Sequence, residues 1–211
     1  MLRNLFTYLL ILLVINFLWL ETQFLKAEEI FQQREHCVAY QTEEVVFLFV
    51  DSDVVGKTCE ISAQMERQGE YIRFMVSFPI SSLDSGIGMR DEDVAEMLLA
   101  ETYPNINFIS NFIKEEQLSE ALNKGSTKLA GVLEFAGKSH KVKFPLKIYE
   151  QSKTWLVTGK LVTSLSEFGL ELPSVLGGVI ADTRDYLALL VNLHFDRVQG
   201  FSELRDASLS N

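Results

Sequence analysis

The chain has 211 residues, of which 47% are hydrophobic and 23% charged, a composition that suits one globular domain and excludes a disordered chain or a multidomain machine. Its 19 basic and 29 acidic residues give a formal net charge of -10, so its field repels phosphate backbones and nucleic acid is not expected as a partner. Fifteen Phe and six Tyr favour β-structure.

The N-terminus has the layout of a signal peptide. Residues 5–20 form an apolar run behind Arg3, and this run is short for a membrane span. Ala27 supplies a small residue for cleavage, so residues 1–27 are predicted to be a signal peptide, with an uncleaved anchor as the alternative. Either outcome exports the remainder, and the protein is expected to be periplasmic or secreted, with residues 28–36 as a charged leader.

Cys37 and Cys59 are the two cysteines of the chain. In an exported protein, their simplest interpretation is one disulfide, which would join the first two strands and contribute about 3 kcal/mol of stability. A redox or metal site is the competing interpretation. The sequence does not favour it, because there is no Cys-x-x-Cys spacing and no cluster of His or carboxylate residues beside either cysteine.

From Cys37 onward, short runs alternate between apolar and polar residues, which is typical of half-buried antiparallel strands. The clearest runs predict strands over residues 45–50, 59–65, 71–78, 142–148, 155–161 and 186–195. Together they predict an all-β barrel domain over residues 37–199, followed by a C-terminal tail at residues 200–211.

Two stretches have helical spacing. The first, residues 91–102, begins with three acidic residues, which are favourable at the positive end of the helix dipole, and is expected to end before Pro104. The second, residues 113–124, has an apolar stripe and is followed by Gly125, a residue that commonly terminates helices.

The most distinctive segment, residues 74–111, reads FMVSFPISSLDSGIGMRDEDVAEMLLAETYPNINFISN. In it, a strand leads into Ser82-Leu83-Asp84-Ser85-Gly86, then Met89-Arg90-Asp91-Glu92-Asp93, then Tyr103-Pro104-Asn105-Ile106-Asn107-Phe108. This order resembles the YceI-like family of exported lipocalin-like proteins, as does Ser166-Glu167-Phe168-Gly169-Leu170 further along the chain. The resemblance covers roughly residues 37–195.

The resemblance implies an extended lipocalin-like antiparallel barrel of eight strands with one or two short helices. It also implies a homodimer and a ligand, a polyisoprenoid or isoprenoid-quinone-type lipid held in the barrel lumen for carriage, storage or protection. No other cofactor is expected. Large apolar residues at inward positions are the lumen candidates: Phe74, Val76, Phe78, Phe108, Phe144, Leu146, Trp155 and Phe168. Because the chain is acidic, transient membrane contact would depend on apolar contact at the barrel mouth.

Asp84, Arg90 and Asp91 are the polar candidates at one barrel end. Asp84 stands two residues before Gly86 and is a turn former, and Arg90 is expected either to tie this turn to the helix through Asp84 or to contact a ligand headgroup. The sequence departs from the family pattern at the same end, with Asp93 in place of the usual His and Leu165 in place of the usual Arg. These departures concern headgroup contacts and leave the barrel prediction intact.

Enzyme chemistry has little support. There is no Gly-x-Ser-x-Gly, phosphate-loop or His-Glu-x-x-His motif, and the three His residues are far apart, so the chain is predicted not to be an enzyme. Two alternatives to a lipid-binding protein remain open at this point. One is a structural or interaction barrel of the cell envelope with a filled core. The other is an enzyme acting on a lipid, for which Asp84, Arg90 and Asp91 are the concentrated titratable candidates.

Overall fold

The computed structural model describes residues 30–31, 35–46, 50–151, 154–171, 174–175 and 181–201. The chain divides into two compact units, Met1–Gln33 and Arg34–Asn211. In the first unit the described residues are Ile30 and Phe31, and the predicted signal peptide lies outside the described residues. The second unit contains all the elements that follow.

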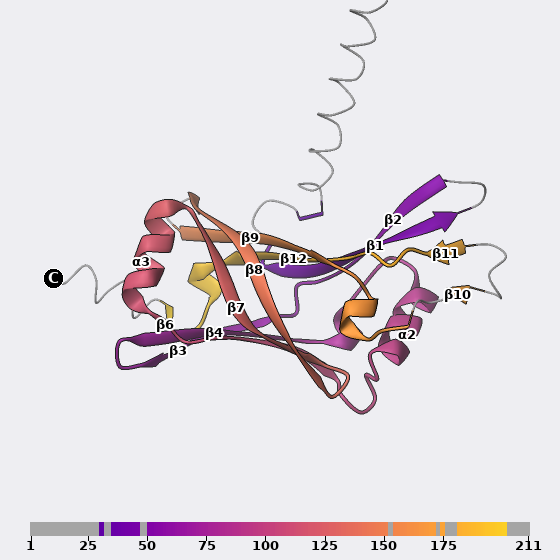
Figure 1. Cartoon of the computed structure of the whole chain (residues 1–211), viewed down its shortest axis with the longest axis horizontal. Coiled ribbons are helices and arrows are strands. Elements are labelled where there is room, and N and C mark those ends of the chain that lie inside the picture. The colour runs from indigo at the N-terminus through magenta and orange to yellow at the C-terminus, as the bar shows by residue number, and fades with distance from the viewer. Residues whose placement is uncertain are drawn as a thin grey trace, which may run out of the picture. The chain divides into compact units, whose positions relative to one another are not determined.

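The second unit is built on one antiparallel sheet (Figure 1). Its strands are β1 (Cys37–Val46), β2 (Val50–Thr58), β3 (Ser62–Gln68), β4 (Tyr71–Pro79), β5 (Asn105–Ser110), β6 (Ile113–Lys114), β7 (Ser126–Phe135), β8 (Lys138–Gln151), β9 (Thr154–Thr163), β10 (Ser174–Val175), β11 (Ala181–Thr183) and β12 (Leu187–His194). They pair in the order β10-β11-β1-β12-β9-β8-β7-β5-β4-β3, with β2 beside β1 and β6 beside β4. The predicted all-β antiparallel fold is confirmed.

The sheet curls, and isolated bridges attach β2 and β3 to other segments of the chain. On β2, the Lys57 N–H donates to the Asp84 carbonyl over 2.9 Å, and the Asp84 N–H returns a bond of 3.0 Å. On β3, Gln64 bridges to Gln199 near the end of the described chain. The described part of the sheet has twelve strands where eight are predicted, and three of these (β6, β10 and β11) are only two or three residues long.

The two predicted α-helices are present as α2 (Gly88–Met97) and α3 (Glu115–Lys124). The described chain also has the short 3-10 turns η1 (Ile80–Ser82), η2 (Ser166–Phe168) and η4 (Phe195–Arg197). α2 ends five residues before the predicted residue 102. It stops there because Leu99 has a left-handed backbone (φ 54°) and its carbonyl accepts bonds from the N–H groups of Thr102 and Tyr103. α3 ends as predicted at Gly125, whose φ of +70° favours glycine.

Most predicted strands lie within observed ones, with two corrections. The apolar run at residues 45–50 is not one strand, because it spans the end of β1 and the start of β2, with residues 47–49 outside the described part of the chain. A continuous apolar run carries no alternation that could show where one strand ends and the next begins. The strand predicted at residues 59–65 is observed as β3, which begins at Ser62, three residues later than predicted. Cys59 and the two residues after it connect β2 to β3.

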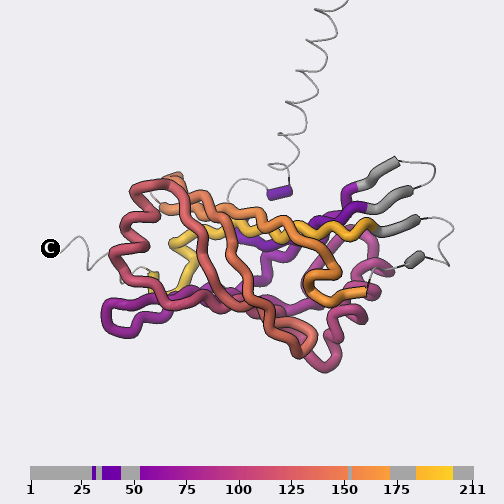
Figure 2. Tube along the Cα trace, viewed as in Figure 1, coloured from indigo at the N-terminus to yellow at the C-terminus, as the bar shows by residue number. Residues whose placement is uncertain are grey.

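Two hydrophobic clusters occupy the two ends of the curled sheet. The first includes Ile72 of β4, Leu118 of α3 and Phe195 of η4. The second is built from residues of η1, β7, η2 and β12 and includes Leu98 at the end of α2. Figures 1 and 2 show α3 and α2 at opposite ends of the sheet, and each helix therefore belongs to a different cluster.

Candidate binding cavity

A cavity of about 540 Å³ lies between the curled sheet and the two α-helices. Its size falls in the range of small-molecule sites, which is about 300–1,000 Å³. The wall comes mainly from alternate residues of the long strands, because successive side chains of a strand point to opposite faces. On β4, for example, Phe74, Val76 and Phe78 line the cavity and Ser77 does not, although Met75, between Phe74 and Val76, is also a lining residue.

Seven of the eight predicted lumen residues line this cavity: Phe74, Val76, Phe78, Phe108, Phe144, Leu146 and Phe168. The structure places Trp155 elsewhere. Trp155 is half-buried on β9 and packs against the cluster around Phe195, beyond the last lining residue of its strand, Val157. Its alternation with Val157 is as predicted, but the strand continues past the point at which the cavity ends.

Aromatic rings shape the wall. Phe108 meets Phe144 edge to face, with ring centroids 5.7 Å apart, and Phe135 meets Phe168 in the same way at 5.5 Å. Gly131 of β7 makes room for the first pair, since a Cβ there would lie 2.7 Å from a ring carbon of Phe108. These contacts hold the rings against the sheet and leave the space beside them open.

At the α3 end, apolar packing forms most of the cavity wall, and the exposed Gln117 of α3 is also a lining residue. Leu118 and Ala121 on the buried face of α3 line it, as does Phe195 of η4. The ring of Phe195 stacks on Phe74 at 5.9 Å and on Phe201 at 4.3 Å. A long apolar molecule entering from the other end would therefore end against hydrocarbon and aromatic surfaces.

The α2 end has a different character. No residue of α2 is buried, yet several of its side chains line the cavity. Arg90 and Asp93 are among them, and with Lys128 they are the charged residues in the described lining. Ile87 and Met89 also line the cavity, although 49% and 73% of their surface is exposed. The cavity therefore opens to the outside at the start of α2.

The three predicted polar residues are divided between the lining and the turn before α2. Arg90 lines the cavity, whereas Asp84 and Asp91 do not. Asp84 Oδ1 accepts a bond of 2.7 Å from the Gly86 N–H, and Asp91 Oδ1 accepts one of 3.0 Å from the Ser85 N–H. Both carboxylates thus fasten the turn, in which Gly86 has a φ of +78°.

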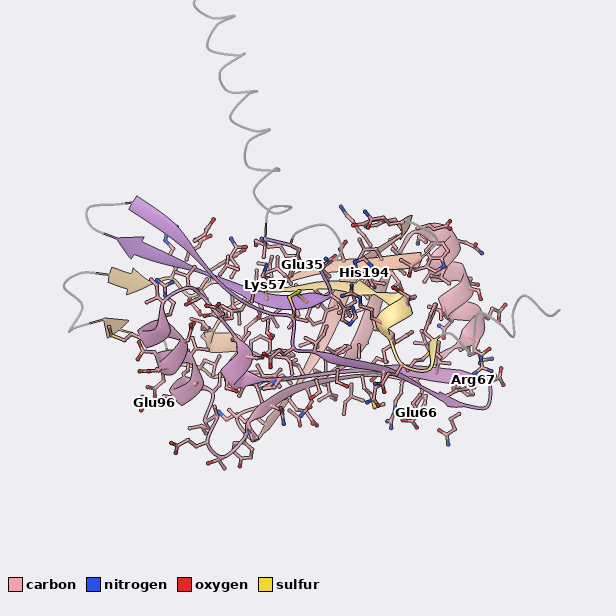
Figure 3. All side chains as sticks on the ribbon, turned by 180° about the vertical axis from the view of Figure 1, so that it is seen from behind. Glu35, Lys57, Glu66, Arg67, Glu96 and His194 are labelled. Carbon is pink, nitrogen blue, oxygen red and sulfur yellow. A yellow bond between two sulfur atoms is a disulfide. The ribbon has the colours of Figure 1, made fainter. Side chains whose placement is uncertain are left out.

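Cys37 and Cys59 form a disulfide that links the start of β1 to the residue after β2, with Cα atoms 4.1 Å apart. Beside it, the Lys57 ammonium donates to both carboxylate oxygens of Glu35, at 2.9 and 3.0 Å, and Figure 3 shows these two residues together. Glu35 and the two sulfur atoms lie close enough to resemble a metal-binding group. The disulfide removes both thiolates, so the group is unsuited to a metal while the bond is intact.

His36 is buried and His140 is half-buried, both in surroundings that the sequence did not indicate. The pKa of His36 is lowered from 6.5 to about 4, mainly by burial and also by nearby Arg197 and His194, while Asp196 has an opposing effect that raises it. Burial, with a smaller effect of Lys138, also lowers the pKa of His140, whose ring stacks on Phe135 at 4.7 Å. Neither histidine lines the cavity. Their partners are distant in sequence or lie across a hairpin, so no local pattern could have revealed them.

The sequence matches the profile of the YceI-like domain over residues 37–193, which is more than half of the chain. The chain belongs to the YceI-like family. The match begins at Cys37, the first residue of β1, and ends within β12, so it spans the sheet that surrounds the cavity. No curated protein matches this YceI-like sequence.

Solved structures share the fold of this YceI-like protein. BcnA of Burkholderia cenocepacia is 19% identical with a TM-score of 0.56, and the match covers 75% of this chain and 95% of BcnA. A polyisoprenoid-binding domain of Saccharophagus degradans, implicated in plant cell wall breakdown, is 13% identical with a TM-score of 0.55 and coverages of 74% and 92%. A mutant YceI protein of Campylobacter jejuni with a monobromobimane guest is 18% identical with a TM-score of 0.50 and coverages of 68% and 85%.

None of the helices in the described part of the chain is both long and apolar enough to cross a bilayer.

Proposed function

We propose that the protein binds an isoprenoid lipid, of the polyprenyl or quinone type, inside the cavity and holds it for carriage, storage or protection. The observation that carries this proposal is the wall itself, which is apolar from Leu118 on α3 to Val94 on α2. The polyisoprenoid-binding domain of Saccharophagus degradans, which shares the fold of this chain, supports the same ligand class. The cavity would act as a binding site without catalysis.

The energetics suit a long hydrocarbon. A chain of branched C5 units needs almost no polar partners, and each Å² of apolar surface removed from water contributes about 25 cal/mol. The described charged lining residues are few, and Arg90 and Asp93 belong to the open end at α2. The chain of the lipid would therefore lie among the aromatic residues, with its polar head near Arg90.

The proposal includes export. The predicted signal at residues 1–27 supports it, and so does the disulfide between Cys37 and Cys59, because such bonds persist in oxidising compartments. The protein would then meet its lipid in the periplasm or outside the cell.

Native mass spectrometry of the full chain purified from the exported fraction tests the proposal, followed by organic extraction of any bound lipid. We expect a stoichiometric isoprenoid. The mass of the assembly in the same spectrum shows whether the protein is the homodimer that the family resemblance implies. An empty, folded protein that also fails to bind added geranylgeraniol would overturn the proposal and favour a structural barrel.

A pair of variants locates the ligand. Val76→Trp places a large ring at an inward position of β4, so we expect at least a tenfold loss of geranylgeraniol affinity. Val162→Trp is the matched control, because Val162 lies on β9, is 57% exposed and does not line the cavity. Equal affinities of the two variants, both folded by circular dichroism, would place the lipid outside the cavity.

Arg90→Gln separates the two roles considered for Arg90. If its guanidinium contacts the headgroup, the variant loses affinity for geranylgeranyl diphosphate more than for geranylgeraniol, with stability unchanged. If Arg90 is structural, urea unfolding shifts and the ratio of the two affinities stays the same.

A further inference from the structure

The opening of the cavity has an apolar rim. Ile87, which caps the N-terminus of α2, and Met89 in its first turn are largely exposed, and both also line the cavity. A side chain that contacts both solvent and the cavity lies at the opening of the cavity. A molecule that enters or leaves at this end must therefore slide past two hydrophobic side chains.

This rim differs from the rest of the exposed lining. The other described lining residues that are exposed are Gln64, Asp93, Gln117 and Lys128, all of them polar or charged. Among the described lining residues, exposed apolar side chains thus occur only at the start of α2. In the isolated protein this exposure gains no hydrophobic stabilisation, and contact with an apolar phase would provide it.

The helix behind the rim is acidic. From Gly88 to Met97, α2 has one basic residue, Arg90, and four acidic residues, which gives a net charge of -3 (+1 and -4). Because none of these residues is buried, this charge is close to whatever the rim contacts. It repels an anionic membrane surface and is tolerated by a zwitterionic one.

We propose that Ile87 and Met89 form a docking tip that inserts into a zwitterionic lipid surface while ligand enters or leaves the cavity. The inference rests on the proposed function, since an isoprenoid chain crosses from bilayer to cavity without exposure to water only if the opening touches the hydrocarbon region. The contact is apolar and is opposed by the charge of α2, so it is transient and weakens as anionic lipid is added.

A site-specific probe tests the docking tip on the full chain. Met89→Cys is labelled with the polarity-sensitive fluorophore NBD and mixed with phosphatidylcholine vesicles that contain a doxyl-labelled quencher lipid. The matched control is the same label at Val162→Cys, an exposed apolar position outside the lining. Both proteins carry residues 5–20, so any binding through that run affects both labels alike.

We expect lipid quenching at position 89 to exceed that at position 162 at least threefold, and to fall at least twofold when phosphatidylglycerol replaces part of the phosphatidylcholine. Adding Ile87→Asp to the labelled Met89→Cys protein should abolish the excess quenching. Equal quenching at the two positions, or quenching that rises with phosphatidylglycerol, would overturn the docking tip. The measurement needs no bound ligand, so its failure is distinct from an empty cavity in the native mass spectrum.

Discussion

The Nδ1 atom of His36 accepts a hydrogen bond of 3.0 Å from the backbone N–H of His194, a residue 158 positions further along the chain. Next to this bond, the Asn192 side-chain amide donates to the carbonyl of Glu35 over 2.8 Å. These two bonds fasten the residues just before β1 to the end of β12. Both histidines are at most 7% exposed, so water does not replace the bond easily.

Acid should weaken the protein through His36. The pKa of this residue is lowered from 6.5 to about 4, so the folded protein binds fewer protons than the unfolded chain between these values. The stability associated with neutral His36 is therefore complete above about pH 6.5 and is lost as the pH falls towards 4, by about 3 kcal/mol in total. Urea unfolding across this pH range measures the slope.

The control for this prediction is His36→Asn, because an amide oxygen can accept the same bond and does not titrate. Its free energy of unfolding should vary less with pH than that of the native protein between pH 4 and 6.5, whereas pH effects that do not involve His36 are common to both proteins. Identical slopes for the two proteins would show that His36 is not the group responsible.

Reduction should destabilise the sheet edge at β2. The disulfide closes a loop with a sequence separation of 22, and its loss is expected to cost about 3 kcal/mol. Guanidinium unfolding with and without a phosphine reductant measures this cost. The double variant Cys37→Ala, Cys59→Ala should unfold at the lower denaturant concentration and be insensitive to reductant. A reductant effect that persists in the double variant would contradict the prediction.

Two glycines should respond oppositely to alanine. At Gly131 a Cβ would lie 2.5 Å from the Ile109 carbonyl oxygen and 2.7 Å from the Phe108 ring, so Gly131→Ala should destabilise by about 1–3 kcal/mol. At Gly88 an added Cβ would meet no atom of another part of the chain within 4 Å, and the residue is helical. Gly88→Ala should therefore be neutral or stabilising by up to about 1 kcal/mol. Thermal unfolding of both variants checks the contrast, and equal shifts would contradict it.

Trp155 should matter for stability and not for ligand affinity. It packs against the hydrophobic cluster around Phe195 and does not line the cavity. Trp155→Ala is therefore expected to lower the free energy of unfolding by about 2 kcal/mol, while geranylgeraniol affinity stays within about twofold. Phe108→Ala removes a lining ring and should change the affinity at least fivefold. Fluorescence competition and urea unfolding separate the two readouts. A large loss of geranylgeraniol affinity in Trp155→Ala would contradict this prediction and indicate that Trp155 contacts the ligand.

Local patterns were most successful where the neighbours of a residue on its own strand decide its position. Phe74, Val76 and Phe78 alternate along β4, and all three line the cavity as the alternation predicts. The pattern failed where contacts between distant segments decide the outcome. Trp155 obeys the alternation but does not line the cavity, because it packs against the hydrophobic cluster that includes residues of α3 and η4. Similarly, the run at residues 45–50 gives no sign that β1 ends and β2 begins within it.

The amino-acid sequence by itself determined an antiparallel all-β chain of the YceI-like family, because alternation, turn residues and helix ends are properties of neighbouring residues. Only the tertiary structure decided that inward residues from strands far apart in the chain surround one open space, with apolar packing at α3 and an apolar rim at Ile87 and Met89. The volume of that space equals the volume that the curled sheet encloses minus the volume that the inward side chains fill. That difference is a property of the whole fold, and no local pattern contains it.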